Sequence, residues 1–228
     1  MQAMKPLSVT LATMPLKQRH SLVFKTWIIV FLISFNITTF ADVLDAKLLA
    51  KKYCSECHQI DGNSTDKNIP KIAGFSAALT YDILDQFRSG YRDAKEIKNK
   101  DGRMTDMVKI SKKLKEDEIE SLSFYFSKQK FTPVTQTFNK SLVETGKQLH
   151  LDLCNDCHVD LATNSDDDAP ILAGQWKAYL SEQFKHFSMQ ERKMTRRMKR
   201  KFRKLSDDDK VALIEFYAST KDKKDTSK

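Results

Sequence analysis

Cysteines are few in this sequence and a strand-like alternation is absent, and both facts limit the folds and the chemistry that it can have. It has four cysteines in 228 residues, all in two short clusters, so none is left for a disulfide between distant segments. No segment alternates apolar and polar residues as a half-buried strand does. Hydrophobic residues make up 40% of the chain and charged residues 30%, a balance typical of soluble proteins. These observations predict an all-α protein.

The start of the chain lacks acidic side chains, and residues 1–41 are predicted to be a secretory signal peptide. Basic residues precede the apolar run TWIIVFLISFNITTF, which is shorter than the about 20 residues of a comfortable membrane span. Thr39 and Ala41 are small, as a signal peptidase requires, so we expect cleavage after Ala41 and a periplasmic protein. Met14 is an alternative start. A retained leader would instead anchor the protein to the inner membrane, facing the periplasm.

The chain contains two copies of one module. The segment YCSECHQI (53–60) returns 100 residues later as LCNDCHVD (153–160). Both copies have apolar residues at helical spacing, and a stretch around Pro133 breaks that spacing between them. The sequence therefore predicts two tandem helical domains, residues 42–131 and 139–228, joined by a linker, residues 132–138.

The register of the two copies determines which residues are equivalent. An offset of 100 holds as far as Arg92 and Arg192, and it then falls to 91, as expected for nine extra residues around AKEIKNKDG in the first copy. The lower offset pairs Met107 with Met198. Equivalent positions are expected to play equivalent roles.

The C-x-x-C-H spacing of both clusters is the one at which c-type haem is attached. On a helical turn, two thiols three residues apart reach the two vinyl groups on one haem edge, and the next histidine faces the iron. Two thiol pairs would also suit a zinc site, and a C-x-x-C beside a parallel sheet would suit redox exchange, but neither gains from the histidine. We expect two covalent c-type haems, held by Cys54, Cys57, His58, Cys154, Cys157 and His158.

A haem iron with one histidine ligand has a sixth position, either open or filled. Four of the five methionines beyond residue 41 lie in two matched loops downstream of the clusters. Met107 and Met198 are predicted to be axial ligands, with Met104 and Met194 as alternates; core filling is the ordinary alternative for methionine. Two histidines remain in this region, His150 and His186. Neither has a counterpart in the other copy, and both are expected to be surface or packing residues.

With two such modules in tandem, the chain resembles the dihaem class I cytochromes c, in particular the cytochrome c-four family. It is also similar to the dihaem cytochrome subunit of flavocytochrome c sulfide dehydrogenases. The matching stretches are CxxCH, PILAGQWKAYLSEQF and LSDDDKVALIEFYAS, with their first-copy equivalents. The resemblance implies two cytochrome c folds. It also implies prolines beside the proximal histidines and aromatic residues that pack the last helix on the first, namely Pro70, Pro170, Phe216 and Tyr125.

The chain departs from that family in two places. Gln59 and Val159 stand where the family usually has glycine after CxxCH, and the segment around Met198 is unusually basic, with ten Lys or Arg and one acid in residues 185–204. Such a run is often only a solvated face. Because it brackets Met198, we expect it near an exposed haem edge, where it would steer an acidic redox partner. Nucleic acid is not an expected partner of an exported haem protein.

The leading functional prediction is a one-electron carrier of a periplasmic respiratory chain, with no enzymatic activity of its own. The alternative is an electron-transfer subunit of a larger oxidoreductase, such as a flavocytochrome c sulfide dehydrogenase. A dihaem peroxidase needs an open iron site, and the paired methionines argue against it.

Overall fold

The computed structural model describes residues 45–99, 101–165 and 169–220. The expected signal peptide and its cleavage after Ala41 lie outside these ranges. Within them, no helix combines the length and the apolar character needed to cross a membrane.

The first copy packs its helices around one apolar core. Residues 45–49 are helical and continue into a π-helical turn, and α3 packs on both α4 and α5. Leu84, Ile119 and Phe126 are among the buried residues of this core. The elements of the first copy are η2 (Ala50–Cys54), α2 (Ser55–His58), α3 (Ala77–Arg88), α4 (Met107–Ser111) and α5 (Glu116–Ser127).

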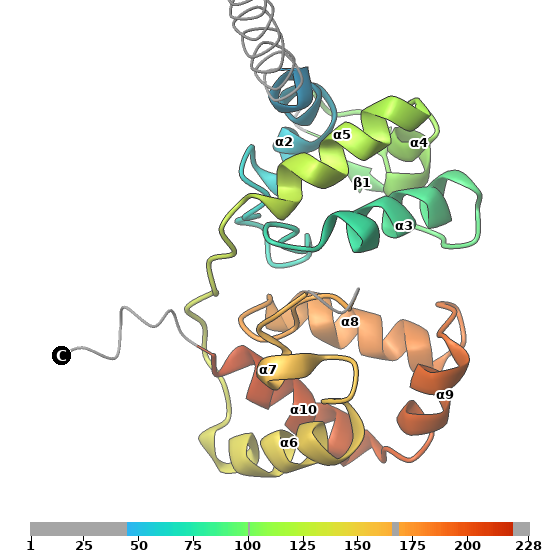
Figure 1. The fold of residues 1–228 in the computed structure, drawn as a ribbon. Coiled ribbons are helices and arrows are strands. Elements are labelled where there is room, and N and C mark those ends of the chain that lie inside the picture. The colour runs from blue at the N-terminus through green and yellow to red at the C-terminus, as the bar shows by residue number, and fades with distance from the viewer. Residues whose placement is uncertain (1–44, 100, 166–168, 221–228) are drawn as a thin grey trace, which may run out of the picture. The chain divides into compact units, whose positions relative to one another are not determined.

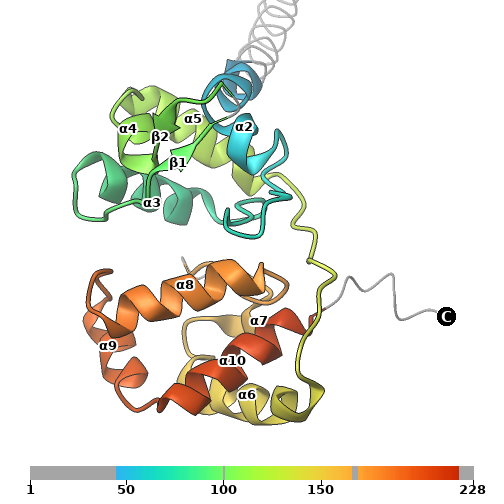
Figure 2. The same cartoon turned by 180° about the vertical axis from the view of Figure 1, so that it is seen from behind.

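A short hairpin interrupts the first copy where its nine extra residues were expected. β1 (Ile97–Lys98) pairs antiparallel with β2 (Met104–Thr105), and Figure 2 shows the pair beside α4. Lys109 of α4 forms an ion pair with Glu96, next to the hairpin. The sequence predicted no strand, because two-residue strands are too short to produce an alternating pattern. The fold is otherwise helical, which confirms the predicted all-α class.

The second copy repeats this helical arrangement. Figure 1 shows α10 lying across α6, and α8 also packs on α10. Ser206 and Asp209 form a capping box at the start of α10: the Ser206 hydroxyl accepts from the Asp209 amide, and the Asp209 carboxylate accepts from the Ser206 amide. The elements are α6 (Lys140–Leu153), α7 (Val159–Ala162), α8 (Lys177–Ser188), α9 (Arg196–Phe202) and α10 (Asp207–Ala218).

The crossing of α6 and α10 depends on a glycine. An ideal Cβ placed on Gly146 would lie 2.0 Å from the Ala212 carbonyl oxygen, so the two helices approach too closely for any side chain there. The equivalent position in the first copy is Ala46, which is buried. The first copy therefore accommodates a methyl group at the position where the second copy requires glycine.

The two copies contact each other through hydrogen bonds and a small apolar cluster. The buried Gln175 amide pairs with the backbone of Lys71, accepting from its N–H at 3.0 Å and donating to its carbonyl. The Trp176 indole donates to the Ser64 carbonyl at 3.0 Å. The apolar cluster consists of Phe75, Leu79 and Ile171. We call these contacts the seam. Residues 130–139, which connect the copies, have no regular secondary structure.

Candidate haem-binding sites

Both CxxCH clusters lie at the end of the first helix of their copy. In the first copy η2 ends at Cys54 and a single turn, α2, carries the chain to His58. In the second copy the amides of Cys157 and His158 both donate to the Cys154 carbonyl, at 3.2 and 3.0 Å, which closes a similar turn. The structure therefore has the helical turn that the i, i+3 spacing of the thiols predicted. None of the four cysteines is in a disulfide.

Each cluster histidine is oriented by a proline carbonyl. His58 Nδ1 lies 3.0 Å from the Pro70 oxygen, and His158 Nδ1 lies 3.2 Å from the Pro170 oxygen. A carbonyl only accepts, so Nδ1 carries the proton and Nε2 keeps its lone pair for a metal. Burial lowers the pKa of His58, and it lowers the pKa of His158 to about 4, so both rings are neutral at pH 7. The prolines stand where the family resemblance implied.

The first thiol of each pair, in Cys54 and Cys154, is shielded from water, whereas Cys157 is exposed. Burial raises the pKa of Cys54 to about 12 and also raises that of Cys154. Thiols used for disulfide exchange have lowered pKa values, so this environment does not favour redox chemistry at sulfur. Among the described residues, no group of three or more His, Cys, Asp or Glu side chains could hold a metal ion. The structure therefore does not gather the two cysteine pairs into the alternative zinc site.

The predicted axial methionines share an apolar core with the first cysteine of their own copy. Met107 and Cys54 both pack against the core of the first copy, and Met198 and Cys154 both pack against that of the second. Each methionine stands at the start of a capped helix. The Asp106 carboxylate caps α4, and the Thr195 hydroxyl caps α9 by accepting from the Met198 amide at 3.2 Å.

The alternate methionines differ between the copies. Met104 belongs to β2 and is 53% exposed. Met194 packs against the same core as Met198. Exposure makes Met104 a poor ligand candidate, whereas in the second copy both thioethers remain candidates. This choice stays a prediction.

The residue that follows the first cluster has an unusual backbone. Gln59 has φ 63° and ψ 163°, a conformation that is almost restricted to glycine and costs other residues about 1–3 kcal/mol. In the second copy Val159 has no positive φ, and the left-handed residues are instead Asp160 to Ala162. In the first copy, Gln59 therefore adopts a strained backbone conformation that glycine would adopt without strain. In the second copy, the left-handed turn lies one to three residues further along the chain, at Asp160 to Ala162.

Replacing Gln59 with glycine is expected to stabilise the protein by about 1 kcal/mol, because the relieved strain exceeds the extra chain entropy of glycine. Urea unfolding followed by circular dichroism measures this. The matched control is Val159→Gly, which relieves no strain and should cost about 0.5–1 kcal/mol. Equal losses in the two variants would contradict this account of Gln59.

Two features of the site were not predicted, although the repeat had paired the residues of the first. Arg92 and Arg192 stack on the rings of Phe87 and Phe187, each 4.6 Å from the ring centroid. The alignment of the two copies shows which residues are equivalent, but it does not show that the arginine and the phenylalanine of one copy contact each other. The second is the hydrogen bond between His150 and Tyr217, at 3.0 Å. His150 was expected to be a surface or packing residue, and it is a buried packing residue of the second copy.

Comparisons with known proteins agree with this geometry. Residues 43–130 match the family model for cytochrome c. Cytochrome c4 of Stutzerimonas stutzeri is 27% identical over 141 residues, covering 59% of this chain and 67% of the relative. Cytochrome c4 of Azotobacter vinelandii is 25% identical over 143 residues, with the same coverages.

Solved structures show the same two-domain fold. Reduced recombinant cytochrome c4 from Pseudomonas stutzeri superposes with a TM-score of 0.63 at 26% identity, covering 78% of this chain and 98% of that one. Thiosulfate dehydrogenase (TsdBA) from Marichromatium purpuratum has a TM-score of 0.61 at 22% identity, with 78% of this chain and 40% of that one covered, and it shows the fold alone. The first copy is therefore a cytochrome c domain, and the whole chain, in which that module occurs twice, is a dihaem c-type cytochrome similar to cytochrome c4.

Proposed function

We propose that this dihaem cytochrome carries single electrons between redox proteins of a periplasmic respiratory chain. The observation that supports this is the same in both copies: a histidine fixed through Nδ1 shares its domain with a methionine packed on the core that also holds the cluster cysteine. Bound haem iron would supply the one-electron chemistry, and methionine opposite histidine raises its reduction potential. The periplasmic location is supported by the leader-like composition of residues 1–41.

In this proposal the four cysteines tether the haems and the remaining groups hold the irons. The Pro70 and Pro170 carbonyls orient the imidazoles of His58 and His158 by accepting from Nδ1, and burial keeps both rings neutral. The thioethers of Met107 and Met198 would each supply a further ligand to the iron of their own copy. These side chains bind and orient the group, and the protein catalyses no reaction of its own.

Substitution of the axial methionines tests the ligand assignment. Met107→Ala and Met198→Ala should each remove about half of the near-infrared charge-transfer band of the oxidised protein, because a methionine sulfur bound to ferric iron gives rise to that band. Absorbance spectra of the purified holoprotein measure it. The matched controls, Met104→Ala and Met194→Ala, should leave the band intact. A band lost in Met194→Ala but kept in Met198→Ala would reassign the second ligand.

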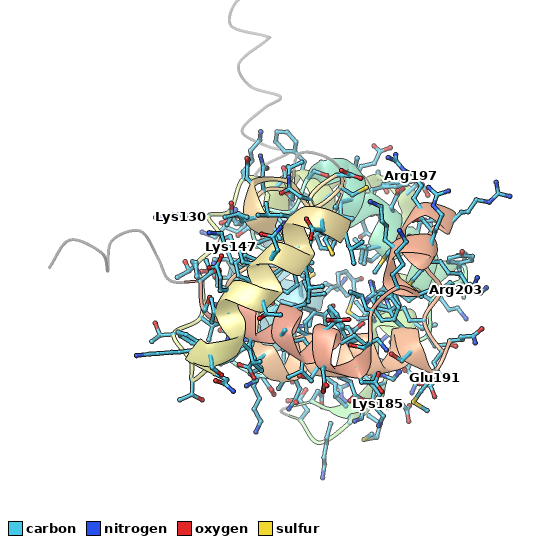
Figure 3. The ribbon with its side chains drawn as sticks, turned by 90° about the horizontal axis from the view of Figure 1, so that it is seen from below. Lys130, Lys147, Lys185, Glu191, Arg197 and Arg203 are labelled. Carbon is cyan, nitrogen blue, oxygen red and sulfur yellow. The ribbon has the colours of Figure 1, made fainter. Side chains whose placement is uncertain are left out.

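The partner proposed for this carrier is an acidic redox protein, and the surface that would receive it surrounds α9. Among the described residues of the run 185–204, Lys201 is the one Lys or Arg in an ion pair, with Asp156. Figure 3 shows Arg197 and Arg203 along one edge of the second copy. The exposed basic residues of this basic face are Lys193, Arg196, Arg197, Arg200, Arg203 and Lys204. Because α9 also carries Met198, charge and proposed ligand lie on the same helix.

Neutralising the basic face tests docking. The triple variant Arg196→Gln, Arg197→Gln and Arg200→Gln should slow electron transfer to a negatively charged blue-copper protein about tenfold at low salt, and it should flatten the dependence of the rate on salt. Stopped-flow rates over a salt series measure this. The control removes three exposed lysines of the first copy, Lys112, Lys113 and Lys115, and should have little effect. Equal losses in both triple variants would show that net charge, and not this face, controls the encounter.

A further inference from the structure

One peptide group of the first copy is hydrogen-bonded at both of its polar atoms. Its carbonyl belongs to Pro70 and accepts from His58 Nδ1 at 3.0 Å. Its N–H belongs to Lys71 and donates to the side-chain oxygen of Gln175 at 3.0 Å. His58 and Gln175 are both buried, so water competes little for either bond. Because Gln175 lies in the second copy, this peptide connects the proposed iron ligand of one copy to a side chain of the other. We call the connection the relay.

The chemistry of the groups determines the direction of every bond in the relay. A carbonyl oxygen only accepts, so His58 Nδ1 carries the donated proton. A backbone N–H only donates, so the oxygen of the Gln175 amide faces the Lys71 nitrogen. The nitrogen of the same amide donates to the Lys71 carbonyl, which requires the same orientation independently. The donors therefore follow one another in a single sense, from the imidazole through the peptide to the Gln175 oxygen.

The first copy offers the second no equivalent side chain. The counterpart of Gln175 is Phe75, a buried residue of the apolar cluster in the seam, and its ring has no oxygen to accept a hydrogen bond. The His158 bond to the Pro170 carbonyl is also the longer of the two, at 3.2 Å against 3.0 Å for His58. Both imidazoles thus donate to a proline carbonyl, and Gln175 extends this arrangement in the first copy.

Hydrogen bonds in such a chain strengthen one another, because a peptide that donates through its N–H becomes a better acceptor at its oxygen. The Gln175 oxygen therefore strengthens the bond from His58 to Pro70. An imidazole that donates more strongly through Nδ1 is a more basic ligand through Nε2, and it favours ferric iron, which has the higher charge.

We propose that Gln175 lowers the reduction potential of the haem attached in the first copy, acting across the seam through the peptide of Pro70 and Lys71. Gln175 is a positioning residue, since it acts through His58 and belongs to the other copy. The inference rests on the proposed function, because it takes His58 to be the iron ligand.

Gln175→Met tests the inference in the holoprotein, because methionine keeps the length of the side chain and lacks the amide. At a fixed solution potential, the ratio of reduced to oxidised first haem should rise about threefold, which is roughly 28 mV at 59 mV per tenfold for a one-electron couple. The second haem should keep its potential. Redox titration followed by NMR resolves the two haems and measures both potentials.

The matched control is Trp176→Phe, which removes another hydrogen bond of the seam, from the indole to the Ser64 carbonyl at 3.0 Å. It weakens the seam and leaves the relay in place, so both potentials should stay unchanged. Equal shifts of the first haem in the two variants would overturn the inference, because a loosened seam would then explain them. An unchanged or lowered first potential in Gln175→Met would overturn it as well.

A second measurement needs no substitution. In the reduced, diamagnetic holoprotein, NMR detects the Nδ1 proton of each ligand histidine, and a stronger hydrogen bond moves that proton to lower field. The His58 proton should resonate downfield of the His158 proton, and the reverse order would contradict the relay. The charge-transfer band is recorded on the same samples. Its absence from the unsubstituted protein would count against the proposed function, whereas an unmoved potential with the band intact counts against the relay alone.

Discussion

Replacing Gly146 with alanine is expected to destabilise the protein by about 3 kcal/mol or more, although alanine is the better helix former. The new Cβ would lie 2.0 Å from the Ala212 carbonyl oxygen, 2.6 Å from its carbonyl carbon and 2.8 Å from Phe216 Cβ. Backbone atoms cannot turn aside as a side chain does, so α6 and α10 have to separate. Separation loosens the core of the second copy along the whole crossing.

Urea unfolding followed by circular dichroism shows whether Gly146→Ala raises or lowers the free energy of unfolding. Helix propensity alone predicts that the substitution stabilises by about 1 kcal/mol, which is the outcome that would contradict the crossing argument. The matched control is Ala46→Gly at the equivalent position of the first copy. That position already holds a methyl group, so the control should cost only about 1 kcal/mol in helix propensity and a further fraction for the lost burial.

Removing one pair of thiols is expected to halve the covalent haem content. In the double variant Cys54→Ala and Cys57→Ala, the first copy has no thiol to form a covalent bond to haem, while the second copy is unchanged. Acid–acetone extraction removes haem that is held only by coordination, so one haem per chain should remain in the pellet where the unsubstituted protein keeps two. Intact mass and pellet absorbance measure this.

The mirror variant, Cys154→Ala and Cys157→Ala, is the control and should leave the other haem. Two haems retained in either variant would show that the substituted pair is not the tether. The two single-haem proteins also allow the two reduction potentials to be measured one at a time. Each variant would lose a cofactor that stabilises the folded state by binding to it, so we also expect the affected copy to unfold at a lower urea concentration.

Local patterns predicted the parts of the fold and the site that local geometry determines. The i, i+3 spacing of Cys54 and Cys57 requires a turn, and the structure has that turn in α2. The acids after Ser206 lie in the first turn of α10, where acidic side chains suit a helix N-terminus. The all-α class followed from apolar spacing alone. In each case the decisive interaction joins residues within about one helical turn of each other.

Other features depend on contacts that no local pattern encodes. His150 and Tyr217 are 67 residues apart, and each is individually ordinary, so only their meeting in the core makes them a pair. The strands β1 and β2 are too short to show the alternation of apolar and polar residues that predicts a strand. The strain at Gln59 is a backbone property that a departure from the family pattern signalled without explaining. Between Met194 and Met198 the core contacts are alike, and a ligand test is needed to separate them.

The connection between the two copies has a consequence for how strong the seam has to be. Residues 130–139 tie the second copy to the first, so their meeting is intramolecular, at an effective concentration on the order of millimolar for a short tether. An interface with a dissociation constant of about 1 mM, worth about 4 kcal/mol, is then already half-formed. The Gln175 amide on the Lys71 backbone and the small cluster around Phe75 need add little beyond that. Tethering thus lets an interface too weak to join two separate proteins hold these two together.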